Sequence, residues 1–490
     1  MIDKTLIVRK RVWGCFLLLL LILDLGYSYH QYASHSYIDG DFPLIVLGGE
    51  PYDQVLQDPL GIAALQGESY PGTNRFTSHA VMSFYFKTIP FVLQTALAPI
   101  DSLYTSIALT KLLIHIGLLF LLSYYVSSWK GFNASLFLLA AVLISPFFQA
   151  GPVYYEYMAI IDGSITYVMF YALPTFFLLV YFLPFYRYFR NRVISANPLF
   201  VGSWLLFTLF LVLFGPLPGP IILLFCITAL GFLLVKNFFT TSDIDPLTRL
   251  IIAVKKINTT VLVLLVGSLI FSLYSTYLGT KNSENNWSPL TLEERYSKLI
   301  QGLNDAFLNF DSGFIFLFIM MIVQLLVLFI FYRKEQNLLF KLYFFLMLFA
   351  TAYLFLLPMG GYRIYRPLVV KHDTLLPVSV LVLFLSATSG ILLFNYFNKV
   401  GRFFYIISIS ALLGFYTYKD KPWSNTNECE KRTISKIARA VEDCVVLPRE
   451  CTVGMWNLNT ECNNSELAVT LFQYYNIFPR KIYYHFESEN

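Results

Sequence analysis

The residues best suited to chemistry are two aspartates separated by one glycine, in the stretch Tyr-Ile-Asp-Gly-Asp-Phe-Pro at residues 37–43. They follow closely on the first long apolar stretch of the chain. A carboxylate in this position can act as a general base toward an acceptor hydroxyl. Asp39 and Asp41 can also share a divalent metal such as Mg²⁺ or Mn²⁺, because hard cations prefer oxygen ligands. Asp-Gly is also a common turn signal, so the motif alone is equally compatible with a plain turn.

Two later loops add charged side chains of both signs. Glu156 lies within Tyr-Tyr-Glu-Tyr, and Asp162 follows shortly after it. A basic group precedes the tenth apolar stretch and consists of Arg363, Arg366, Lys371 and His372. Guanidinium and ammonium groups suit a phosphate or a pyrophosphate, although charge balance or interfacial anchoring would also explain them. If these loops share one membrane surface, that surface offers acids for chemistry and bases for a phosphate.

The composition places these residues in a membrane protein. Of the 490 residues, 57% are hydrophobic and only 13% are charged, whereas an ordinary soluble domain has about 25% charged residues. A disordered chain, a nucleic-acid-binding protein and a soluble multidomain enzyme are therefore excluded. The net charge of +5 reflects Lys and Arg at the flanks of the apolar stretches.

Eleven stretches are apolar enough to cross a bilayer, for which a helix needs about 20 such residues. They cover residues 12–28, 104–126, 133–149, 165–186, 199–215, 219–235, 258–278, 313–332, 338–358, 375–396 and 403–418. The pair 199–215 and 219–235 is also compatible with a re-entrant hairpin. The first stretch has no clear small-x-small cleavage site, so we expect a retained helix and not a signal peptide.

The basic residues predict the orientation, because Lys and Arg accumulate in cytoplasmic loops. With Lys4 and Arg9 inside, every loop expected in the cytoplasm is basic. The loop 29–103, expected outside, holds only Arg75 and Lys87. We therefore predict an integral membrane protein with a cytoplasmic N-terminus and an extracytoplasmic C-terminal tail, in a periplasm, a lumen or the cell exterior.

Four of the six cysteines fall in that tail, namely Cys429, Cys444, Cys451 and Cys462. Disulfides persist in oxidising compartments, so their clustering agrees with the orientation. No CxxC pair is present, which makes a zinc site the weaker interpretation. Four cysteines allow three pairings, and the sequence does not choose among them.

The predicted fold is an all-α polytopic membrane protein of about 11 transmembrane helices with a small α/β C-terminal cap. The transmembrane part is residues 1–418, and its first outside loop is too long for a connector. We expect juxtamembrane helices at 58–66 and 78–97, lying flat in the interface because they are too interrupted to span. The tail, 419–490, should carry helices at 431–443 and 466–475 and a strand at 481–486, stapled by disulfides because a core of this size is small.

In these features the chain resembles the GT-C superfamily of integral-membrane glycosyltransferases. The resemblance rests on Asp39 and Asp41 soon after the first apolar stretch, and on the expected juxtamembrane helices 58–66 and 78–97. It covers roughly residues 1–400. Members take a sugar from a polyprenyl-phosphate or polyprenyl-diphosphate donor. The Asp-Gly-Asp form departs from the adjacent acidic pair of several families, which leaves open which aspartate is the base.

The resemblance implies a role for each candidate residue. Asp39 or Asp41 would deprotonate the acceptor hydroxyl, and Glu156 or Asp162 would support a metal or orient the acceptor. The donor phosphate would be held by the basic group Arg363, Arg366, Lys371 and His372. The implied partners are membrane lipid, a lipid-linked sugar donor and a glycan, lipid or protein acceptor, with a divalent metal as the conceivable cofactor and with no nucleic acid.

Three other functions stay open. A glycan polymerase or ligase of another fold needs basic residues outside but no acidic pair in the first outside loop. A non-catalytic transporter or flippase needs charged or broken helices near the midplane, and Lys111 and His115 are four residues apart in the second apolar stretch. A non-catalytic subunit would use the tail to bind a partner. The chain has no GxxxxGK[ST] loop and no HExxH, which disfavours an ATP-driven pump.

Overall fold

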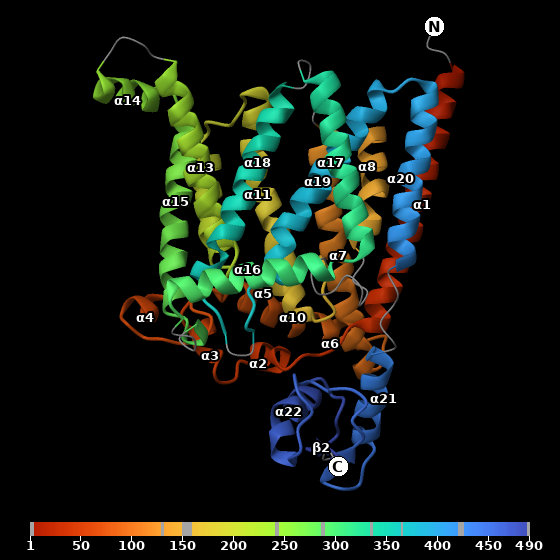
Figure 1. The fold of residues 1–490 in the computed structure, drawn as a ribbon. Helices are drawn as coiled ribbons and strands as arrows, with labels where there is room; N and C mark the ends of the chain where they lie inside the picture. The colour runs from red at the N-terminus through yellow and green to blue at the C-terminus, as the bar shows by residue number, and fades with distance from the viewer. Residues whose placement is uncertain are drawn as a thin grey trace.

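A computed structural model describes residues 4–128, 132–148, 159–240, 245–285, 290–333, 337–363, 366–419 and 426–487. The molecule is a helical bundle with a small domain below one end (Figure 1). Within the described residues, nine helical segments are long and apolar enough to cross a membrane. They contain α1 (Lys4–His35), α7 (Pro99–Ser127), α11 (Leu173–Asn191), α13 (Pro218–Phe239), α15 (Thr259–Thr280), α17 (Ser312–Tyr332), α18 (Asn337–Leu356), α19 (His372–Tyr396) and α20 (Lys399–Lys419).

Two further predicted spans are helical but shorter. One is α8 (Ala134–Ile144), which continues into η1 (Ser145–Phe148), and the other is α12 (Pro198–Val212). The 15 residues of α12 reach about 22 Å at roughly 1.5 Å per residue, against a hydrocarbon core of about 30 Å. The all-α, membrane-like fold is thus confirmed, while the count of eleven spans stays a prediction.

The third long span, Ile165–Asn191, is not a uniform α-helix. It begins as α10 (Ile165–Tyr167), passes through one π-helical turn, η2 (Val168–Ala172), and continues as α11. A π-turn inside an α-helix changes the direction of the side chains beside it and is frequent at functional sites. Here it carries aromatic side chains at the end of the bundle that faces the small domain.

The two ends of the bundle are different. The N-terminus lies at the upper end in Figure 1, together with α14 (Pro246–Lys255). The lower end holds α2 (Asp41–Leu47), α3 (Asp53–Gln57), α4 (Ile62–Leu65), α5 (Phe76–Phe86), α6 (Ile89–Leu93) and α16 (Leu292–Asn309). The short turns η3 (Ser283–Asn285) and η4 (Leu357–Gly360) complete the described helices of the bundle.

The juxtamembrane helices exist, but their bounds differ from the prediction. The helix expected at 58–66 is only α4, because Gly61 turns the chain with a φ of 70°. Asp58 still accepts hydrogen bonds from the first backbone N–H groups of that helix. The segment 78–97 divides into α5 and α6 with a break before Ile89, so Pro90 lies in the first turn of a new helix, where proline is tolerated.

The tail forms the predicted small α/β unit. It contains α21 (Thr426–Ala438), β1 (Cys444–Leu447), η5 (Cys462–Ser465), α22 (Glu466–Tyr474) and β2 (Tyr483–Phe486). The two strands pair in parallel, with Cys444 opposite Tyr483. The helix expected at 431–443 is α21, which begins and ends five residues earlier.

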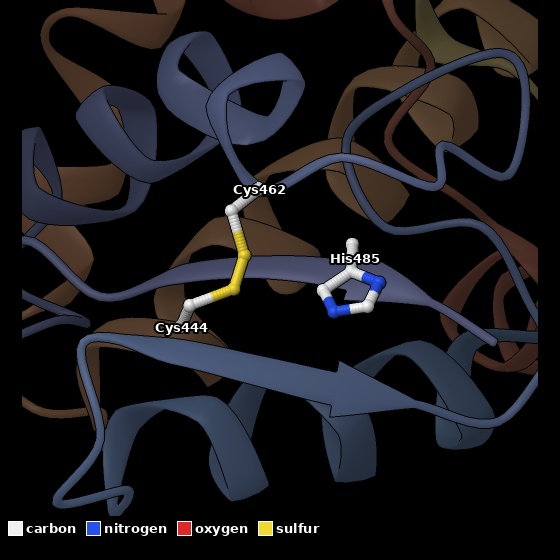
Figure 2. A group of neighbouring side chains, drawn as sticks. All are labelled: Cys444, Cys462 and His485. Carbon is white, nitrogen blue, oxygen red and sulfur yellow. A yellow bond between two sulfur atoms is a disulfide. The ribbon is translucent and has the colours of Figure 1, made fainter.

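Two disulfides staple this unit, as the cysteine clustering predicts. Cys429 pairs with Cys451 and Cys444 pairs with Cys462. His485 of β2 lies beside the second bridge (Figure 2). The two sulfurs are bonded to each other and offer no thiolate, which is the form that binds zinc.

The tail is anchored to the segment between α1 and α7. Tyr475 donates a hydrogen bond from its hydroxyl to the carbonyl of Phe86 (2.9 Å), and Gln94 donates to the carbonyl of Tyr475 (2.9 Å). Glu430 of α21 accepts from the backbone N–H of Ile38, just before the two aspartates. The tail therefore packs against the segment that carries the candidate catalytic residues.

Candidate functional site

Asp39 lies in the link between α1 and α2 and is completely buried. One carboxylate oxygen accepts from the backbone N–H groups of Asp41 and Phe42, both at 3.0 Å, and from the Thr166 hydroxyl at 2.9 Å. The other accepts from the Ser164 hydroxyl at 2.5 Å. A carboxylate has about four acceptor positions, and four protein donors contact this one, three at one oxygen and one at the other.

These four contacts define what Asp39 does. Burial raises the pKa of Asp39, and the four hydrogen bonds oppose that rise. The contacts fix the first turn of α2 and join it to α10, more than a hundred residues away in the chain. A metal ion would have to replace donors already in place, so Asp39 does not fit as a metal ligand.

Asp41 has a different environment one turn away. It is the first residue of α2, whereas we expected it in a loop. Its side chain is only partly buried. Burial and the neighbouring Asp39 raise the pKa of Asp41 to about 6, while a hydrogen bond from Trp456 and the charge of Arg75 lower it. A carboxylate with this pKa is ionised at neutral pH and still basic enough to accept a proton.

Two arginines converge on a single carboxylate beside Asp41. Glu284 of η3 pairs with Arg363 (2.6 Å) and with Arg75 (3.4 Å), and it accepts a hydrogen bond from the Tyr52 hydroxyl (2.9 Å). Burial alone would raise the pKa of Glu284, but the two arginines and the hydrogen bonds hold it below its usual value. Two separate segments of the chain thus place guanidinium groups on the carboxylate that lies beside the candidate base.

The remaining predicted phosphate ligands form pairs of their own. Arg366 makes a two-fold contact with Asp373 in the first turn of α19. His372 Nε2 lies 2.6 Å from Asp162 Oδ2. Lys371 occupies the N-cap position of α19, where its backbone N–H donates to the Thr374 hydroxyl at 3.0 Å. These pairs fix the start of α19 against the loop that holds Asp162.

Aromatic rings of the π-turn segment connect these groups. The ring of Tyr167 contacts that of Trp456 edge-on, with centroids 6.0 Å apart, and lies 6.0 Å from that of His372. Tyr171, one turn further, interacts electrostatically with Arg363, Arg366 and Asp373. The acidic and basic residues therefore belong to one continuous cluster at the lower end of the bundle.

A histidine with unoccupied ring nitrogens borders this cluster. His79 of α5 is almost fully buried, with its ring edge-on to those of Tyr52 and Phe170. Burial and the nearby Arg75 lower the pKa of His79 to about 3, so the ring is neutral. Neither ring nitrogen has a hydrogen-bond partner in the described part of the chain. A neutral imidazole here can donate to or accept from a substrate group.

The predicted residues are thus mostly brought together. Asp39, Asp41 and Asp162 gather with Arg363, Arg366 and His372, whereas Lys371 lies at the N-cap of α19. Glu156 lies in a stretch, 149–158, that the structure does not describe. Among the described residues, the only group of three ligands within metal-binding distance is the cysteine–histidine group of the tail. We therefore assign no metal to the Asp39–Asp41 pair.

Sequence reasoning missed several members of the cluster. Glu284 lies in a polar stretch of an outside loop, and Arg75 is one of two basic residues in the first outside loop. Arg75 carried a usable signal, since basic residues are few in that loop, whereas Glu284 is one of several charged residues in its stretch. Trp456 carried no such signal, because nothing in the sequence indicates that a tryptophan of the tail contacts a loop of the bundle.

The buried polar pair of α7 has a packing role. Lys111 Nζ donates to the Ser36 hydroxyl (2.8 Å) and to the carbonyl of Gly163 (2.6 Å). His115 contacts the Tyr32 hydroxyl at 3.1 Å and stacks on Phe148. These contacts hold α1 and the 159–164 loop against α7, which agrees with a polar contact inside the bundle.

The cluster combines one partly buried base, convergent guanidinium groups and aromatic walls. That combination suits proton removal from a hydroxyl next to a bound anion. Comparisons of the chain with known protein families and with curated proteins find no match.

Proposed function

We propose that this protein transfers a sugar from a polyprenyl-phosphate or polyprenyl-diphosphate donor to an acceptor hydroxyl at the extracytoplasmic membrane surface. The observation that carries the proposal is Asp41, a carboxylate with a pKa of about 6 beside the convergent pair Arg75 and Arg363. The cluster lies at the end of the bundle opposite the N-terminus (Figure 1), and in this proposal the lipid-linked donor enters it sideways from the bilayer.

Asp41 is the general base in this proposal, and Asp39 is a positioning residue. Asp41 takes the proton of the acceptor hydroxyl as its oxygen bonds to the anomeric carbon of the sugar. The bond from that carbon to the phosphate oxygen breaks, and the polyprenyl phosphate or diphosphate leaves with the electron pair. Asp39 cannot serve in this way, because protein donors occupy both of its oxygens.

Arg75 and Arg363 stabilise the leaving phosphate. Guanidinium groups match phosphate oxygens in charge and in geometry, and their effect grows as negative charge develops in the transition state. Glu284 holds the two groups at one point before the donor binds. Arg366 and His372 act indirectly, because their pairs with Asp373 and Asp162 set the position of α19.

The direct test uses purified protein in proteoliposomes with a panel of radiolabelled polyprenyl-phosphate sugars. The readout is release of polyprenyl phosphate, with an extract of membrane glycans as acceptor. We expect Asp41→Asn to reduce the rate by about 10² to 10⁴, the usual contribution of acid–base catalysis. Arg363→Ala should raise KM for the donor, because a charge-assisted contact is lost.

Asp53→Asn is the matched control. Asp53 begins α3 in the same outside loop but takes no part in the cluster, so this variant should keep full activity. Full activity of Asp41→Asn would refute the assignment of the base. If the wild-type protein released no polyprenyl phosphate from any donor of the panel, the transferase proposal itself would fail.

A further inference from the structure

An apolar cavity lies in the bundle, apart from the cluster around Asp41. Its volume is about 230 Å³, and it is bordered by α7, α11, α13, α15, α18 and α19. Side chains such as Leu178, Phe225 and Phe349 form its wall. A space this apolar does not hold ordered water, which needs polar partners. Its natural occupant is a hydrocarbon chain.

The cavity is long in the direction of the membrane normal. Along α11 its lining residues extend from Thr175 to Arg192, which corresponds to about 25 Å at roughly 1.5 Å per residue. One lipid leaflet fills about half of a hydrocarbon core of roughly 30 Å. The cavity can therefore take the acyl chain of a lipid from a single leaflet.

Three cations line the cavity at its end away from Asp41. They are Arg192, which follows α11, Lys236 in the last turn of α13 and Lys341 in the first turn of α18. All three are exposed, and no ion pair within the described part of the chain involves them. Arg192 has a left-handed φ of 58° and lies over the ring of Tyr188, which also lines the cavity.

We propose that the cavity binds one acyl chain of an anionic glycerophospholipid whose phosphate lies against Arg192, Lys236 and Lys341. The apolar wall accounts for the chain, and the cationic end accounts for the sign of the headgroup. Basic pockets between transmembrane helices bind such headgroups. The site is separate from the donor site, because its cations lie at the opposite end of α11, α13 and α18.

The test is native mass spectrometry of the purified full-length protein titrated with dioleoyl phosphatidylglycerol or dioleoyl phosphatidylcholine. We expect tighter binding of phosphatidylglycerol. The double variant Lys236→Gln/Lys341→Gln should weaken the affinity for phosphatidylglycerol about 25-fold, because each charge removed costs roughly fivefold. Lys255→Gln/Lys256→Gln removes two charges at the same end, on and after α14, and should leave the affinity unchanged.

A second pair of variants tests the acyl chain. Ala229→Trp fills the cavity, which Ala229 lines, and should abolish retention of phosphatidylglycerol. Gly231→Trp is its control, because a side chain at Gly231 meets open space. Intact protein mass and the melting temperature identify any variant that fails to fold.

Equal affinity for the two lipids, or no effect of either variant, would overturn the proposal. The proposal would also fail if the cavity bound decaprenyl phosphate and this binding were lost in Arg363→Ala but kept in Lys236→Gln/Lys341→Gln. The occupant would then be the donor lipid. Lipid binding is measured without turnover, so this result is independent of whether the transferase proposal succeeds.

Discussion

Asp39 and Asp41 are separated by a single glycine, yet their surroundings differ enough to give them different roles. Asp39 has four protein donors, while Asp41 is partly buried and accepts a hydrogen bond from Trp456. Gly40 makes this arrangement feasible, because a Cβ there would lie 2.8 Å from the indole ring of Trp456. In the proposed mechanism, these two identical carboxyl groups therefore act as a positioning group and as a base.

The pH dependence of transfer should report the Asp41 carboxyl. A base with a pKa of about 6 must be deprotonated to act, so kcat/KM should fall about tenfold per pH unit below pH 6. Glu284→Gln removes a negative charge near Asp41 and should shift this acidic side of the pH profile to lower pH. Trp456→Phe removes a donor and should move it to higher pH. Measured profiles between pH 5 and 8 that are identical in wild type and both variants would contradict the assignment.

Asp39→Asn should act on stability before it acts on chemistry. An amide offers one accepting oxygen, so the buried hydroxyls of Ser164 or Thr166 would lose their acceptor. An unsatisfied buried donor costs about 1–3 kcal/mol. We expect a lower melting temperature in detergent than for Asp53→Asn, measured by intrinsic fluorescence. A melting temperature equal to that of wild type would show that the four contacts do not hold the α1–α2 link.

At the scale of elements, the tail is part of the site and not an appendage. Glu430 of α21 accepts a hydrogen bond from the backbone N–H of Ile38, and Trp456, from the segment before η5, donates one to Asp41. The two disulfides close loops within the tail, which restricts the unfolded chain and stiffens the unit that carries Trp456. The membrane bundle supplies the acidic residues and the arginines of the candidate site, and the tail supplies Trp456, which forms one of its walls.

The attachment of the tail should weaken as pH rises. Burial raises the pKa of Glu430 from 4.5 to about 8, so the folded state binds this proton more tightly than the unfolded state. The stabilisation is complete below about pH 4.5 and is lost as pH rises through 8. Hydrogen exchange of α21 should increase between pH 6 and 9, after correction for intrinsic rates. Glu430→Gln cannot titrate and should abolish that increase, and an unchanged pH response in this variant would contradict the prediction.

At the scale of the whole molecule, the asymmetry of the two ends gives the bundle its direction. The candidate site and the disulfide-bonded tail share one end, and the N-terminus lies at the other (Figure 1). The basic loops predict that the N-terminal end is cytoplasmic. Both proposals depend on this asymmetry, because it places the Asp41 cluster and the cationic end of the cavity in opposite leaflets.

Cysteine labelling can test the orientation. Val441 is 88% exposed in the tail, and Lys399 begins α20 at the opposite end of the bundle. In a background with Cys15→Ser, a membrane-impermeant maleimide applied to intact cells should label Val441→Cys but not Lys399→Cys. Permeabilised cells should label both. The reverse pattern in intact cells would place the tail in the cytoplasm and remove the extracytoplasmic site.

The sequence by itself determined the helical membrane architecture. All eleven apolar stretches contain helix, because apolarity over some 15 to 25 residues is a local property and a bilayer leaves backbone groups only internal partners. It also located Asp39 and Asp41, the helices and β2 of the tail, and the clustered cysteines. These features depend on residues close together in the chain.

Only the tertiary structure decided which residues meet. Asp41 meets Trp456, and Glu284 meets both Arg75 and Arg363, although these partners are far apart in the chain. The different surroundings of the two aspartates and the pairing of the four cysteines were decided in the same way. Hydrophobic periodicity predicts which segments become helices, but the burial and the partners of a polar side chain depend on how those helices pack.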